Sequence, residues 1–238
     1  KAIRRQRQMC IRDRVITIVN KILLLKRREK NMLKLIKKLM VLFVLFFIIG
    51  LGNCSKVNAA PFLYFDGKMT NGKDIYYWID SSCQYTASIP QAVSKLRYPS
   101  GMWNPMVLNK TTTKSYSKMD FYQYYDENST SPAGTNLYPA KINGKEQNPL
   151  SKSDANSMDW AYTKIYINDA VIYPQDLNGQ CRYDPDLLST IILHEICHAY
   201  GGNHVFEPQS CIMYYKTDFT IRGLCSDFND VLVQKYNY

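Results

Sequence analysis

All three histidines of this chain fall in one short segment, from His194 to His204. The segment fits the pattern H-E-x-x-H-x-x-G-x-x-H. Residues four apart lie on one face of a helix, so His194 and His198 can present ring nitrogens to the same metal ion. Gly201 then lets the backbone leave the helix with a positive φ angle. That turn allows His204 to approach the same ion as a third ligand.

Three protein ligands leave one coordination position open for water, which is typical of a catalytic zinc site. Glu195 is rotated by about 100° from His194, so it can reach that water without being a ligand. Zinc lowers the pKa of the water to roughly 7, and Glu195 can then take its proton. A structural zinc site usually has a fourth ligand, for which Cys197 is the nearest candidate. Because Cys197 projects away from Glu195, we expect it to be buried or in a disulfide instead.

The basic charge of the chain lies almost wholly at its N-terminal end. Residues 1–59 hold fifteen Lys or Arg and two acidic residues, whereas residues 60–238 hold fifteen Lys or Arg and eighteen acidic residues. The net charges of the two parts are therefore +13 and −3, although the whole chain carries +10. We expect no nucleic-acid binding, because the basic residues belong to the leader.

Residues 32–59 have the pattern of a signal peptide. A short basic segment begins at Met32, and an apolar run follows from Leu39 to Leu51. This run is shorter than the ~20 residues that span a bilayer. Small residues near Ala59 predict cleavage before Ala60. Residues 60–238 are then expected to be a secreted domain. We also expect this domain to be a monomer. We expect residues 1–31 to be a dubious or non-native upstream segment; a retained membrane anchor at the cell surface is the alternative.

The exported part contains five cysteines, and export permits disulfides. They are Cys83, Cys181, Cys197, Cys211 and Cys225. An odd number leaves at least one thiol without an intramolecular partner. A bridge between Cys197 and Cys211 is one hypothesis, and buried free cysteines are the other.

The remaining pattern predicts one domain of mixed α/β (α+β) class. Strands are predicted at 74–80, 106–108, 119–125 and 161–168 from β-branched and aromatic residues. Helices are predicted at 88–96, after an N-cap at Asp184, and from Ser226 to the end. Residues 126–158 are rich in Asn, Ser, Gly and Pro, and predict a long loop.

The part from Trp160 to Tyr238 resembles the catalytic domain of bacterial matrixin-like metzincins. The resemblance rests on the Lys164–Asn168 strand, the extended histidine motif, the Ile212–Tyr214 turn and the terminal helix. It implies a metzincin (zincin-like) catalytic domain, in which a twisted mixed sheet lies above an active-site helix and a C-terminal helix follows. It also implies a secreted zinc endopeptidase that acts on a peptide or protein substrate.

The resemblance assigns a role to each site residue. His194, His198 and His204 match the ligands of one catalytic zinc ion, and Glu195 matches the general base. Met213 matches the methionine of the Met-turn, whose role is packing beneath the metal. The region Lys164–Asn168 would be the edge strand, along which the substrate binds by β-augmentation.

Three positions depart from the matrixin pattern. Cys197 replaces a glycine, Val205 stands where a serine is frequent, and Tyr215 replaces a proline. Tyr215 follows Met213 by two residues, the offset at which astacin-like and serralysin-like relatives place a zinc-binding tyrosine. It is therefore a candidate fifth ligand or transition-state hydrogen-bond donor. An ordinary tyrosine beside the turn is the other interpretation.

Two other functions compete with the endopeptidase. A cell-surface binding or adhesion protein would use the same scaffold with a non-catalytic zinc, but it would not need Glu195. An exopeptidase would need a group that binds a substrate terminus, and the sequence offers no clear candidate. The pocket beside zinc is expected within residues 205–226, and structural Ca2+ sites show no recognisable spacing.

Overall fold

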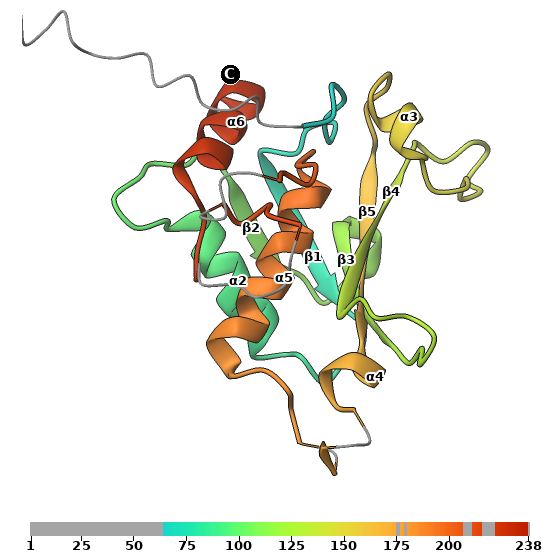
Figure 1. Cartoon of the computed structure of the whole chain (residues 1–238). Helices are drawn as coiled ribbons and strands as arrows, with labels where there is room; N and C mark the ends of the chain where they lie inside the picture. The colour runs from blue at the N-terminus through green and yellow to red at the C-terminus, as the bar shows by residue number, and fades with distance from the viewer. Residues whose placement is uncertain (1–63, 175–176, 179, 207–210, 216–221, 238) are drawn as a thin grey trace, which may run out of the picture. The chain divides into compact units, whose positions relative to one another are not determined.

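This computed structural model describes residues 64–237 except 175–176, 179, 207–210 and 216–221 (Figure 1). The chain separates into two units, Lys1–Val57 and Asn58–Tyr238, and all described residues belong to the second. The predicted signal peptide and the segment before it lie outside the described residues. Within the described residues, no helix is both long enough and apolar enough to cross a membrane.

A mixed five-stranded sheet forms the centre of the described part. Its strands are β1 (Asp74–Ile79), β2 (Val107–Lys110), β3 (Ser117–Tyr124), β4 (Ala133–Tyr138) and β5 (Tyr162–Asn168). The strand order is β2-β1-β3-β5-β4. Neighbouring strands are parallel except for β4, which pairs antiparallel with β5. The predicted strands are confirmed within a few residues, and the predicted α+β class is confirmed.

The helices are α2 (Ser88–Arg97), α3 (Lys152–Ala155), α4 (Asp169–Ile172), α5 (Pro185–Ala199) and α6 (Ser226–Tyr236). A 3-10 helix, Lys114–Tyr116, precedes β3. Helices α2 and α5 lie side by side in Figure 1. Alternate residues of the strands, among them Tyr77, Phe121 and Ile165, are buried in the core that includes both helices. This alternation follows from the two-residue period of a strand.

Two sequence-based expectations are wrong. Residues 126–158 are not one long loop, because they contain β4 and α3. The strand containing Lys164–Asn168 is not at the edge of the sheet, because β5 lies between β3 and β4. On that side of the sheet the edge strand is β4, which pairs with β5 despite the weak strand propensity of Gly134 and Asn136.

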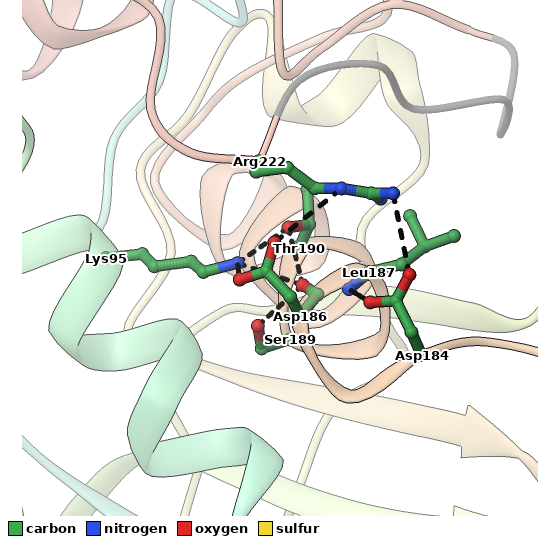
Figure 2. Close-up of polar contacts among 7 residues, drawn as sticks. All are labelled: Lys95, Asp184, Asp186, Leu187, Ser189, Thr190 and Arg222. Carbon is green, nitrogen blue, oxygen red and sulfur yellow. Dashed lines mark hydrogen bonds and ion pairs between the residues drawn. The ribbon is translucent and has the colours of Figure 1, made fainter.

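The N-terminus of α5 is held by charged residues from three segments (Figure 2). The Asp184 side chain accepts a hydrogen bond of 2.7 Å from the Leu187 N–H, which confirms the predicted N-cap. Lys95 of α2 lies 2.8 Å from the carboxylate of Asp186. Arg222 lies 3.6 Å from Asp184 and also 3.6 Å from Asp186. Each exposed pair contributes little energy, but together these contacts fix where α5 begins.

Candidate metal centre

The last two turns of α5 and the turn that follows bring the three histidines together. His194 and His198 come from one face of the helix, as their spacing predicts. Gly201 has φ of +97°, which confirms the predicted exit from the helix. Candidate ligand atoms of His194, His198 and His204 all lie within 4.8 Å of one another.

Two backbone carbonyls determine which nitrogen each helical histidine directs to the centre. Nδ1 of His194 lies 2.6 Å from the Ile212 carbonyl oxygen, and Nδ1 of His198 lies 2.7 Å from that of Gly202. Because a carbonyl oxygen only accepts, both Nδ1 atoms carry the proton. Both Nε2 atoms therefore present lone pairs. They lie 3.1 Å and 3.2 Å from Nε2 of His204.

A small cation fits this arrangement of nitrogens. Ligands at tetrahedral angles and a zinc–nitrogen distance of 2.0–2.1 Å are separated by about 3.3–3.4 Å. The observed separations of 3.1 Å and 3.2 Å are close to that value. Without a cation, the Nε2 lone pairs of His194 and His198 both face Nε2 of His204. A neutral His204 carries at most one hydrogen on that nitrogen, and it can donate this hydrogen to only one of the two lone pairs. The donor set is compatible with zinc, although imidazole also suits copper, iron and nickel.

Burial keeps the histidines in the neutral form that metal binding requires. Desolvation is the largest effect on His194 and His198, and it lowers the pKa of each to about 4. Desolvation also lowers the pKa of His204. At neutral pH, a metal ion therefore has few protons to displace from these rings.

We expect the metal-free protein to lose stability as the pH falls below about 6.5. The unfolded histidines bind protons near pH 6.5, but the folded His194 and His198 resist protonation down to about pH 4. Their stabilising contribution is thus complete above pH 6.5 and is lost between pH 6.5 and 4. The free energy of unfolding should fall by up to about 1.4 kcal/mol per pH unit for each histidine.

Urea unfolding of the metal-stripped protein between pH 6.5 and 5 measures this effect, before most carboxylates titrate. A His198→Asn variant should show a smaller slope, because one buried imidazole is gone. A free energy of unfolding that stays constant over this interval would contradict the prediction.

The turn after α5 is closely packed against the segment that contains Met213. A Cβ atom on Gly202 would lie 2.8 Å from the Phe228 ring and 3.0 Å from Cε of Met213, so a larger residue does not fit. The Met213 carbonyl accepts a hydrogen bond of 2.9 Å from the Val205 N–H. Met213 itself is fully buried. This packing holds the chain on both sides of His204.

Glu195 lines a cavity together with the three histidines. Its Oε2 accepts a hydrogen bond of 2.8 Å from the hydroxyl of Thr135, on the edge strand β4. Burial raises the pKa of Glu195, while His194 and the Thr135 hydroxyl act in the opposite direction. A buried carboxylate with a raised pKa, beside a cluster of metal-binding side chains, is characteristic of a functional site.

A cavity of about 350 Å3 adjoins the three histidines and Glu195. Residues 131–135, in and before β4, line it opposite α5, together with Lys152 of α3. The predicted location of the pocket, within residues 205–226, is therefore incomplete. In the described part of that range, Tyr214 and Tyr215 line the cavity. The contribution of β4 was missed because it comes from the segment predicted to be a loop.

Tyr215 lies on the wall of the same cavity as the histidines. Its ring packs against those of Phe206 and Tyr214, with both centroid distances 5.0 Å. The side chain is 43% exposed, so it can reach solvent or a bound molecule. Its role as a fifth ligand or hydrogen-bond donor stays a prediction.

Cys197 lies inside the core and takes no part in the histidine cluster. It is fully buried, as expected, and its thiol is free. Within the described residues, the group able to hold a metal ion comprises the three histidines.

A search against models of protein families and a search of curated proteins found no match to this chain.

Proposed function

We propose that the chain is an extracellular zinc-dependent endopeptidase of the metzincin type. The observation that carries this proposal is the convergence of neutral imidazole nitrogens beside a buried carboxylate that is not a ligand. His194, His198 and His204 would hold the ion, which would polarise a peptide carbonyl and lower the pKa of a water. A purely structural zinc site would need neither the adjoining cavity nor Glu195.

In this mechanism Glu195 is the group that moves protons. Its carboxylate takes a proton from the attacking water and later delivers it to the departing amine. The Thr135 hydroxyl lies 2.8 Å from Oε2 of Glu195 and 2.9 Å from the backbone carbonyl oxygen of the same residue, so it orients the carboxylate relative to β4. The Nδ1–H bonds of His194 and His198 to backbone carbonyls hold the imidazole rings in place. Bulk water has little access to this carboxylate, because Glu195 is only 8% exposed.

Strand β4 is the surface along which we expect an extended peptide to bind. Among the described residues, no strand pairs with the side of β4 that faces away from β5. The Leu137 carbonyl on that side accepts a hydrogen bond from the Leu150 N–H. Because backbone direction alternates along a strand, the backbone of Thr135 faces the same way. A peptide that adds to this edge by β-augmentation would pass the cavity beside Glu195.

Zinc content and cleavage of a mixed peptide library test the proposal directly. The expected result is one zinc ion per chain and cleavage that a chelator abolishes and added zinc restores. The library should contain end-blocked and free peptides, because an endopeptidase cuts both. A protein that binds zinc but cuts no peptide would favour a non-catalytic binding protein, and cleavage restricted to free ends would favour an exopeptidase.

Replacing Thr135 with valine is expected to lower kcat roughly tenfold, since a hydrogen bond to a charged group contributes about 1.5–3 kcal/mol. Valine has the same shape but cannot donate to Glu195. Zinc content should be unchanged, because Thr135 does not contact the ligands' nitrogens. The matched control is Thr135→Ser, which keeps the hydroxyl. Equal rates for the serine and valine variants would mean that the hydroxyl does not position Glu195.

A further inference from the structure

The cavity beside the metal centre extends along strand β4 and helix α5. Ala133 of β4 packs with Ile191 of α5. Thr135 hydrogen-bonds Glu195, which lies about one turn further along the helix. Leu137, the next residue on the same side of β4, also lines the cavity. One end of the cavity therefore lies near Ala133, and the other end lies beyond Glu195, near Leu137.

Helix α3 lies at the end of the cavity near Leu137 (Figure 1). The Leu150 N–H, just before α3, donates a hydrogen bond of 2.7 Å to the Leu137 carbonyl. The Ser151 hydroxyl accepts a hydrogen bond of 3.2 Å from the Asp154 N–H, and the Asp154 carboxylate accepts one of 3.0 Å from the Ser151 N–H. These bonds hold in place the backbone that carries Lys152.

Lys152 is the only positively charged side chain among the described residues that line the cavity. Ala155, three residues later on the same face of α3, lines it too. Lys152 is exposed, and within the described residues no acidic side chain forms an ion pair with it. The acid of α3, Asp154, is instead bonded to Ser151 in the cap. The cavity therefore has an unpaired cation at this end.

The wall around Lys152 is mostly apolar. Four apolar residues line this end of the cavity: Phe65, Leu137, Leu150 and Ala155. The Gly67 N–H donates a hydrogen bond of 3.0 Å to the Ala155 carbonyl, which holds the segment that contains Phe65 against α3. Because an apolar wall excludes part of the water, it screens an ion pair with Lys152 less than an open surface would.

We propose that Lys152 binds a carboxylate of the bound peptide and so makes the site selective for negatively charged substrates. This inference rests on the proposed function, because it takes the ligand to be a peptide that lies along β4. Such a peptide would pass Thr135 and then reach Leu137, beside α3. The carboxylate belongs either to an aspartate or glutamate side chain or to the peptide C-terminus. The Lys152 ammonium group can donate hydrogen bonds to both.

Binding of short peptides to the full chain carrying Glu195→Gln, with zinc present, tests the proposal without cleavage. One peptide is neutral, rich in glutamine and blocked at both ends. A second set replaces one glutamine at a time with glutamate, and a third peptide is the neutral one with a free C-terminal carboxylate. We expect glutamate at one position, or the free carboxylate, to improve the affinity about 3–10-fold. Whichever peptide gains identifies the source of the carboxylate, and added salt should reduce the gain.

Lys152→Met should remove this gain and leave the affinity for the neutral peptide unchanged, because methionine keeps an unbranched side chain without the charge. Lys152→Glu should reverse the preference, so that lysine at the same peptide position binds better than glutamate. Lys145→Met is the matched control. Lys145 is exposed between β4 and α3 and does not line the cavity, so its replacement should preserve the gain.

Equal affinities for charged and neutral peptides, binding of none of them, or a gain that persists in Lys152→Met would overturn the proposal. Cleavage of the same peptides by the parent protein is measured separately. If the parent cuts none of them but glutamate still improves binding through Lys152, the peptidase function fails and the carboxylate site stands. If the parent cuts charged and neutral peptides with the same kcat/KM, the peptidase function stands and the inference about Lys152 fails.

Discussion

Replacing Glu195 with glutamine is expected to lower kcat by about 10³-fold, within the range for loss of a general acid–base group. Glutamine keeps the size of the side chain and can still accept the hydrogen bond from Thr135. It cannot take a proton from water at neutral pH. Zinc content should stay at one ion per chain, because Glu195 does not belong to the group of candidate ligands. Steady-state kinetics and metal analysis of the same preparation measure both quantities.

Glu127→Gln is the matched control for this experiment. Glu127 is exposed and accepts a hydrogen bond from the Tyr125 hydroxyl, and it does not line the cavity. This variant should keep the parent kcat. If Glu195→Gln also kept it, Glu195 would not be the general base. If Glu195→Gln lost its zinc, the lower rate would report metal binding rather than proton transfer.

Local signals in the sequence were sufficient for several elements. Helix α5 has an N-cap at Asp184, proline at its first position and a continuous apolar body, and all three act within a few residues. Strand β1 has the composition and alternation of a half-buried strand, and its burial pattern alternates accordingly. The geometry of the histidine motif likewise depends only on residues that are close in sequence. Its geometry follows from helical spacing and from the one glycine whose φ is +97°.

Features that depend on pairing between distant segments were not predictable. Strand β4 has the sequence AGTNLY, which has weak strand propensity, and its stability comes from its ladder with β5. The position of β5 inside the sheet is also a property of strand order. The half-exposed Tyr166 of β5 would also suit an edge strand. In the structure, however, the Tyr166 ring stacks on the ring of Tyr122 in β3, with the centroids 5.3 Å apart. Propensity cannot distinguish these two environments.

The site was predictable only as far as its ligands and base. Thr135 hydrogen-bonds Glu195 across 60 residues of sequence, and no spacing rule connects them. The same is true of the Ile212 carbonyl that orients His194. For the cysteines, the hypothesis that paired Cys197 with Cys211 was based on proximity along the motif. In the structure both thiols are free and buried, as the other hypothesis stated.

Replacing Trp160 with alanine is expected to destabilise the domain by about 3–5 kcal/mol, the usual cost of removing a buried aromatic ring. Trp160 is fully buried, and its ring meets that of Phe65 edge to face at 6.4 Å. Its Nε1–H donates a hydrogen bond of 3.0 Å to the Ala199 carbonyl at the end of α5. Alanine would leave a cavity and would also leave that buried carbonyl without its donor.

Trp103→Ala is the matched control, because the Trp103 side chain is 63% exposed and should contribute less than about 0.5 kcal/mol. Trp160→Phe should fall between the two, since it keeps most of the ring but loses the donor. Urea unfolding at pH 7.5 compares all three. The Trp160 ring lies beside Gly201, where an added Cβ atom would be 3.4 Å from it, and Gly201 starts the turn to His204. Trp160→Ala should therefore also release its metal faster to a chelator. Equal stability of the Trp160→Ala and Trp103→Ala variants would show that the ring does not support this turn.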